Sequence, residues 1–135
     1  MSYLLDTNVV SETRKRRASP QVLAFLKSLP STSMHISVLT LGEMRRGVAM
    51  KAETDPILAA EFADWLSDAK RFYDDRILPV TGEVADQWGK MSADRSRPVA
   101  DTLIAATALV NDLTLVTRNE RDFVGLNLRL INPWS

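Results

Sequence analysis

The sequence predicts an α/β protein with three layers, in which helices cover both faces of a central, mostly parallel sheet. Short apolar runs of strand length alternate along the chain with longer stretches whose apolar residues recur at helical spacing. This alternation is typical of parallel sheets, because each connection between parallel strands usually carries a helix. With 135 residues, 45% hydrophobic and 25% charged, the chain fits one domain over residues 1–135.

Two strands are predicted in the first part of the chain. The apolar run 3–5 stops at Asp6 and leads into a helix near Asn8, and the run 34–38 forms a second strand. Ligands of such sheets bind beyond the carboxyl ends of the strands, where distant parts of the sequence converge. Asp6 occupies such a position at the end of the first strand.

Helix starts are marked by residues that cap helices. A polar cap followed by proline favours a helix start, and so does a Thr-x-x-Glu capping box. Amphipathic stripes follow each of these signals. The predicted helices therefore begin at Ser19-Pro20, at Thr40 with Glu43, at Asp55-Pro56 and at Thr81.

The last part of the chain supplies three more strands and one buried helix. The run 76–80 is predicted as a short strand in which Pro79 marks either an edge strand or a strand end, because proline cannot donate a hydrogen bond to a neighbouring strand. The stretch 99–110 is apolar almost all round, as expected of a helix packed closely on a sheet. The runs 113–116 and 128–131 complete the sheet.

Composition excludes several kinds of chemistry. The chain has no cysteine, which removes disulfides, thiolate zinc sites and cysteine nucleophiles. The one histidine, His35, lies in an apolar run and is interpreted as a strand residue, so serine triads lack a base. No apolar run is long enough to cross a bilayer, and a cytoplasmic location is expected.

The overall charge gives no sign of nucleic-acid binding. There are 17 basic and 17 acidic residues, so any contact with nucleic acid must be local. The one dense basic run, 14–17, is equally consistent with a solvated loop and with phosphate contact.

Three acids stand where polar groups are expected to converge. Asp6, Glu43 and Asp101 could each be a helix-capping or helix-terminal acid. Together they predict a carboxylate cluster, because Asp101 starts a helix otherwise nearly without charge. Two ionised carboxylates at about 5 Å repel by roughly 3 kcal/mol at an effective dielectric near 20, so protonation or a divalent cation must relieve them. Oxygen ligands alone favour Mg²⁺ or Mn²⁺ and phosphodiester hydrolysis.

The acids lie in segments that resemble the four motifs of PIN-domain ribonucleases. The similarity spans nearly the whole chain, including the ending 131–134, and is greatest to the VapC-type toxins in their FitB-like branch. The segments are Leu4-Leu5-Asp6-Thr7-Asn8-Val9-Val10-Ser11-Glu12, Ile36 to Gly47, Ala100-Asp101-Thr102-Leu103-Ile104-Ala105-Ala106-Thr107-Ala108 and Val116-Thr117-Arg118-Asn119.

The resemblance implies a PIN-like fold and a Mg²⁺-dependent endoribonuclease, with Mn²⁺ as a possible substitute. It implies the toxin of a type II toxin–antitoxin pair: a homodimer inhibited by a small DNA-binding antitoxin, and reaching promoter DNA only through that antitoxin. Transfer RNA is the substrate expected from the family. By motif position, Asp6 and Asp101 would bind the metal directly, and Glu43 directly or through water.

The fourth acidic position departs from the FitB-like pattern. That branch has an aspartate where this chain has Asn119, whereas other members have an acid three residues later, matching Asp122. Both residues therefore remain candidates for this catalytic position. Candidate RNA-binding residues are Thr7, Asn8, Arg14, Arg45, Arg46, Thr117 and Arg118.

Two other functions compete with this interpretation. A phosphatase with Asp6 as nucleophile, of the haloacid-dehalogenase type, needs a second aspartate where Asn8 stands, and the sequence counts against it. A catalytically inactive PIN fold that acts only as a binding partner in a DNA-bound complex stays open, with Asn119 in its favour.

Overall fold

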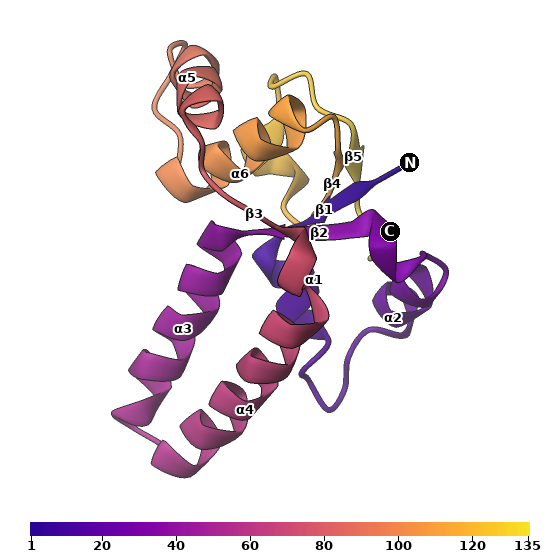
Figure 1. Cartoon of the computed structure of the whole chain (residues 1–135), viewed down its shortest axis with the longest axis vertical. Helices are drawn as coiled ribbons and strands as arrows, with labels where there is room; N and C mark the ends of the chain where they lie inside the picture. Colours follow the sequence, from indigo (N-terminus) through magenta and orange to yellow (C-terminus); the bar gives the residue numbers. More distant parts are fainter.

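The computed structural model describes all residues, 1–135, and contains one five-stranded sheet whose paired strands are all parallel. The strand order is β3-β2-β1-β4-β5 (Figure 1), which places the first strand in the middle. The strands are β1 (Tyr3–Leu5), β2 (Met34–Ser37), β3 (Ile77–Leu78), β4 (Thr114–Val116) and β5 (Leu130–Ile131). The three-layer parallel α/β architecture expected from the sequence is confirmed, and β3 is an edge strand as Pro79 indicated.

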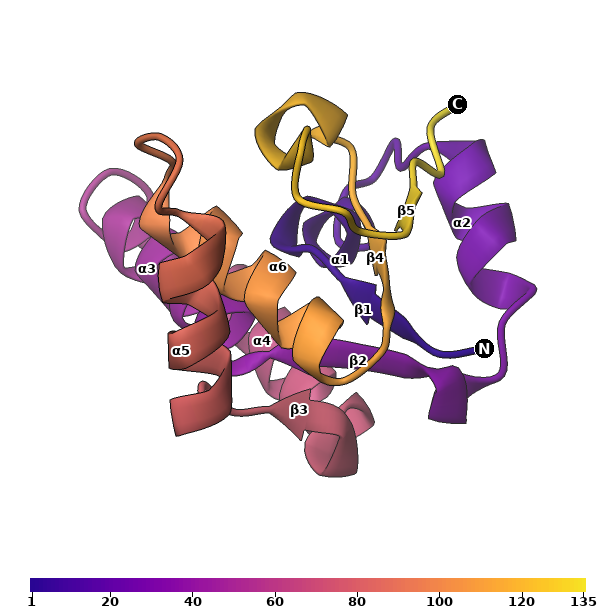
Figure 2. The same cartoon turned by 90° about the horizontal axis from the view of Figure 1, so that it is seen from above.

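Helices cover the sheet on both sides. In Figure 1, α5 and α6 lie above the strands, and α1 to α4 lie below them, with α3 and α4 forming a long hairpin. Figure 2 shows α6 lying against the sheet, with α5 beside it. No helix has the length and apolar character needed to span a membrane. The helices are α1 (Thr7–Glu12), α2 (Pro20–Lys27), α3 (Val38–Ala52), α4 (Pro56–Phe72), α5 (Gly82–Met91) and α6 (Val99–Val110).

The two faces of the sheet carry separate hydrophobic cores, because successive side chains of a strand point to opposite faces. On β1, Leu4 packs in the core between the sheet and helices α5 and α6, and Leu5 packs in the core between the sheet and helices α1 to α4. On β4, Leu115 and Val116 divide in the same way. All four side chains are fully buried, which fixes the register of the central strands.

The start of α3 differs from the sequence-based prediction. The helix begins at Val38 rather than at Thr40, because the Ser37 hydroxyl accepts a hydrogen bond from the Leu39 N–H (3.0 Å) and caps the first turn. The Thr40–Glu43 capping box was therefore a wrong interpretation. Both side chains are free to make contacts outside their own helix, and both contact α1.

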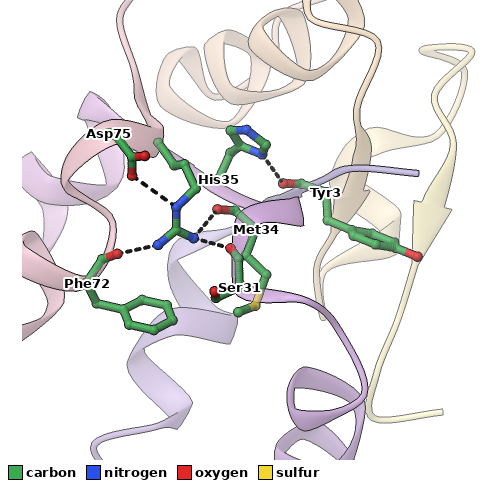
Figure 3. A network of polar contacts seen from close by, with 7 residues as sticks. Tyr3, Ser31, Met34, His35, Phe72 and Asp75 are labelled. Carbon is green, nitrogen blue, oxygen red and sulfur yellow. Dashed lines mark hydrogen bonds and ion pairs between the residues drawn. The ribbon is translucent and has the colours of Figure 1, made fainter.

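Arg76 joins the edge of the sheet to the helical layer (Figure 3). Its side chain is 12% exposed, and the guanidinium donates to the carbonyls of Ser31, Met34 and Phe72 and pairs with Asp75. In the same view His35 lies against β1, with Nδ1 3.3 Å from the Tyr3 carbonyl oxygen, which agrees with a strand role for this histidine.

Candidate functional site

The candidate site lies beyond the carboxyl ends of β1, β2 and β4, which meet at one edge of the sheet because these strands are parallel. Leu5 pairs with Val116, so the residues that follow them, Asp6 and Thr117, are neighbours. The Asp6 N–H donates to the Val116 carbonyl (2.9 Å), which extends the ladder by one residue. The fold thus places Asp6 at the centre of this edge.

Asp6 is an acid buried to 4% exposure at the N-terminus of α1. Its Oδ2 accepts from the Thr117 hydroxyl (2.8 Å) and from Asn8 Nδ2 (3.4 Å), and its Oδ1 accepts from the Thr7 N–H (2.8 Å). Burial raises the pKa of Asp6 despite these hydrogen bonds, and the charges of Glu43 and Asp122 raise it further. Asp6 is thus held in a fixed orientation with its charge only partly balanced.

Glu43 reaches the same edge from the second turn of α3. Its Oε1 accepts a hydrogen bond from the Thr7 hydroxyl (2.7 Å), which also lies 3.0 Å from the Thr40 hydroxyl. Thr40 is fully buried, and the two threonines connect the start of α1 to α3. Thr40 was missed as a site residue because its spacing to Glu43 matched a capping box, and sequence offered no signal for the contact with Thr7.

Asp101 lies in the first turn of α6, where the helix dipole favours a negative charge. Even so, burial raises the pKa of Asp101 to about 6, with further contributions from the charges of Asp6, Asp122 and Glu43. Asp122 is exposed and belongs to the short 3-10 helix Glu120–Phe123. The charges of acids from separate parts of the chain therefore act on Asp6 and Asp101 at this edge.

The donor set suits a hard divalent cation, although the side chains are not gathered around a common point. As the side chains lie, no three acidic or histidine residues form a group that could hold a metal ion. The charges of Glu43 and Asp122 nevertheless raise the pKa of both Asp6 and Asp101, so binding a cation would relieve the repulsion. Carboxylate oxygens without sulfur or imidazole fit Mg²⁺ or Mn²⁺.

Asn119 and Asp122 occupy different positions relative to the acids. The Asn119 N–H donates to the Thr117 hydroxyl (3.1 Å), whereas its side chain makes no hydrogen bond within the chain. The charge of Asp122 raises the pKa of both Asp6 and Asp101. Of these two residues, only Asp122 therefore affects the pKa values of the acids at this edge.

The candidate RNA-binding arginines lie on different parts of the chain. The guanidinium of Arg14 lies over the Phe62 ring (4.1 Å), beside a groove of about 630 Å³ that also reaches Thr7 and Glu43. The guanidinium of Arg118 lies over the Trp134 ring (5.0 Å). Arg45 and Arg46 are exposed on α3 and take part in no ion pair.

Comparison with known proteins agrees with this geometry. The PIN-domain family model matches residues 3–126. Toxin FitB of Neisseria gonorrhoeae is 30% identical over 97% of both chains, and the VapC ribonuclease Y4jK of Sinorhizobium fredii is 30% identical over 98% of this chain and 97% of its own.

A solved structure gives the same result. The crystal structure of FitAcB from Neisseria gonorrhoeae superposes with a TM-score of 0.89 at 30% identity, and the match covers 98% of each chain. The family resemblance seen in the motifs is thereby confirmed over nearly the full length. The chain belongs to the PIN-domain family, in the group that contains the FitB and VapC toxins.

Proposed function

We propose that this chain, acting as one PIN domain, is a Mg²⁺-dependent endoribonuclease and the toxin component of a type II toxin–antitoxin pair. The observation that carries the proposal is the set of four carboxylates, Asp6, Glu43, Asp101 and Asp122, in which burial and neighbouring negative charges raise the pKa of Asp6 and Asp101. Proteins keep such uncompensated acids mainly at functional sites. The names of relatives, among them a VapC ribonuclease, support RNA as the substrate.

In this proposal Asp6, Asp101 and Glu43 hold the cation, and Asp122 is the fourth acid. A bound Mg²⁺ would supply Lewis acidity towards a phosphate oxygen and towards a water molecule. The hydroxyl of Thr117 and the Thr7 N–H fix Asp6, and the Thr7 hydroxyl fixes Glu43. These contacts leave oxygen lone pairs of both carboxylates free for a ligand.

Asp101 contributes a second property. With a pKa of about 6, its carboxyl loses a proton close to neutral pH, so a cation and a proton compete for the same oxygens. Cation binding, and with it RNA cleavage, should therefore weaken as the pH falls through 6. Hydrolysis by water at this site would leave a 5′-phosphate and a 3′-hydroxyl, without use of the RNA 2′-hydroxyl.

We also propose an antitoxin partner and a homodimer. The solved relatives include FitAB of a toxin–antitoxin system bound to a DNA fragment, at 29% identity and a TM-score of 0.78. By analogy, this chain would reach promoter DNA only through a small DNA-binding antitoxin.

The test compares purified wild type with Asp101→Asn and Glu12→Gln on a mixed RNA substrate, with Mg²⁺ or with EDTA. Cleavage by wild type and by Glu12→Gln, dependent on Mg²⁺ and absent in Asp101→Asn, supports the proposal. End-group analysis should find 5′-phosphates. No cleavage by any variant, with an antitoxin complex still formed, would favour an inactive PIN fold that serves as a binding partner.

A further inference from the structure

We propose that Arg118, held over the ring of Trp134, binds a backbone phosphate of single-stranded RNA beside the carboxylates. Trp134 is then a positioning residue that acts through Arg118. This inference rests on the proposed ribonuclease function and adds the residue pair that holds the substrate next to the acids.

The backbone of Arg118 is fixed to the site. Its N–H donates to Asn8 Oδ1 (3.3 Å), and the preceding residue, Thr117, is fully buried and donates its hydroxyl to Asp6. Asn8 in turn lies within hydrogen-bond distance of Asp6 Oδ2 (3.4 Å). Arg118 therefore leaves the sheet directly beside the central carboxylate.

Trp134 provides a firm support for the Arg118 side chain. Trp134 is half-buried and packs against the core between the sheet and helices α1 to α4. The backbone N–H of Trp134 donates to Asn132 Oδ1 (2.9 Å), and Asn132 Nδ2 donates to Glu120 Oε2 (3.3 Å). The C-terminal segment is thus joined to the same 118–122 loop that carries Arg118 and Asp122. An arginine over an aromatic ring keeps its in-plane N–H donors available while losing less entropy on binding.

The charge of Arg118 is not neutralised within the chain. Arg76, Arg97 and Arg129 each form an ion pair with an aspartate, whereas Arg118 is exposed and takes part in none of the ion pairs. Its charge lowers the pKa of Glu12, but less than the contacts of Glu12 with Ser19 and Lys15 do. A cation with free donors so close to repelling acids is suited to an anionic ligand.

The surface beside Arg118 has the right chemistry for phosphate. A depression of about 310 Å³ is lined by Arg118, Asn119, Glu120, Arg121 and Asp122, without a hydrophobic residue. Arg118 and Asp122, the fourth acid, thus share one surface depression. An RNA backbone that approaches the acids is repelled by them, and Arg118 offsets that repulsion at the point of entry. Single strands are favoured because their phosphates can follow a narrow polar surface.

The experiment measures RNA binding without cleavage. Full-length protein carrying Asp101→Asn keeps the RNA intact, and a fluorescein-labelled single-stranded RNA of mixed sequence reports affinity by fluorescence anisotropy at several KCl concentrations. Arg118→Ala, Arg118→Lys, Trp134→Phe, Trp134→Leu and the double change Arg118→Ala with Trp134→Leu are compared. Arg129→Ala is the matched control, since Arg129 is an exposed arginine next to the amino end of β5.

Arg118→Ala should weaken binding by about 5- to 10-fold and reduce the slope of log affinity against log salt by about 0.7, the value for one phosphate on a single strand. Arg118→Lys should retain that slope. Trp134→Leu should weaken binding by about 3-fold in the presence of Arg118 and have no effect in its absence, whereas Trp134→Phe, which keeps a ring, should retain binding. A DNA strand of the same sequence should show the same losses if the contact is to phosphate.

Equal affinities for Arg118→Ala and Arg129→Ala would overturn the proposal, as would an absence of RNA binding by every variant. An undiminished effect of Trp134→Leu in the Arg118→Ala background would show that Trp134 does not act through Arg118. Thermal melts identify any variant that loses its fold. If Trp134→Leu unfolds, Trp134→Phe still tests whether an aromatic ring at this position is enough to retain binding. Because binding is measured apart from cleavage, a wild type that binds through Arg118 but cuts no RNA would refute the ribonuclease proposal alone.

Discussion

Asp6 and Glu12 stand at opposite ends of the same short helix, and their surroundings are electrically opposite. Both acids are buried, Asp6 to 4% and Glu12 to 5% exposure. The pKa of Glu12 is lowered, mainly because its carboxylate accepts a hydrogen bond from the Ser19 N–H (2.8 Å) and one from Lys15, whose ammonium lies 3.0 Å away. The pKa of Asp6 is raised by burial and by neighbouring acids.

Glu12 and Asp6 show two different roles of a buried acid. Glu12 lies under the loop that follows α1, and its partners there balance its charge, so it joins α1 to the start of α2. Asp6 has hydrogen-bond donors but no cation, and the charges around it are of its own sign. A balanced acid stabilises the fold, whereas an unbalanced acid lowers stability until a ligand neutralises it.

The largest expected effect is on RNA cleavage. Asp6→Asn should reduce cleavage by about 100-fold or more, because loss of a metal ligand exceeds the roughly 10- to 100-fold cost of losing an outer-shell partner. Glu12→Gln should change cleavage by less than about 3-fold. Initial rates under saturating Mg²⁺ check both. A similar loss in the two variants would remove the distinction between the ends of α1.

The next largest effect is on metal affinity, and it distinguishes Asp122 from Asn119 as the fourth residue of the site. Asp122→Asn should weaken Mn²⁺ binding by about 10-fold, because it removes a negative charge that acts on Asp6 and Asp101. Asn119→Ala removes no charge and should leave the affinity within about 2-fold. Calorimetric titration measures both. A larger loss in Asn119→Ala would assign the fourth position to Asn119.

A smaller effect is the pH dependence of stability without metal. The lowered pKa of Glu12 contributes stability that is present at neutral pH and is lost as the pH falls below its ordinary value of 4.5. The raised pKa of Asp101 acts oppositely: stability is lost as the pH rises from 3.8 to about 6.

Urea unfolding in EDTA between pH 4 and pH 7 separates the two contributions. Glu12→Gln should lower the unfolding free energy at neutral pH by about 1 kcal/mol, the net contribution of one hydrogen-bonded partner. Asp101→Asn should reduce the loss on raising the pH, and the raised pKa of Asp6 accounts for the remainder. If both variants lost stability at neutral pH, Asp101 would be a helix-terminal acid and nothing more.

The sequence predicted the helices and strands well, because the residues that mark them are close together in the chain. The polar caps at Ser19, Asp55 and Thr81 each accept a hydrogen bond from a backbone N–H of the helix they precede. The prediction failed at Thr40, because Ser37 is an equally good cap three residues earlier and only packing decides between them. Strand ends were predicted less well: the run 128–131 was predicted as a strand, whereas β5 has only the two residues 130–131.

The site was predictable in its residues but not in its electrostatics. Asp6 was identified because it ends an apolar strand, and Asp101 because it opens an apolar helix. The opposite states of Asp6 and Glu12 depend on partners such as Ser19 and Thr117, which only the fold brings near them. The support of Arg118 by Trp134 likewise depends on where the C-terminal segment returns.

We infer that the carboxylates at the edge of the sheet are unbalanced until a divalent cation binds. The rise in the pKa of Asp101 from 3.8 to about 6 corresponds to at most about 3 kcal/mol, and solvent screening at this half-buried residue reduces the expected gain on neutralisation to about 1 kcal/mol. Without metal, Asp101→Asn should therefore be more stable than wild type. A ligand at about 100 times its dissociation constant adds about 2.7 kcal/mol to the protein that binds it.

The most direct test is the urea-unfolding free energy of wild type and Asp101→Asn at pH 7.5, measured in EDTA and in increasing Mg²⁺. We predict that Asp101→Asn is the more stable in EDTA, that wild type gains stability with Mg²⁺ while Asp101→Asn does not, and that their order reverses. Glu12→Gln should gain as much as wild type. Unchanged stability of wild type across the Mg²⁺ series, or a less stable Asp101→Asn in EDTA, would contradict the account.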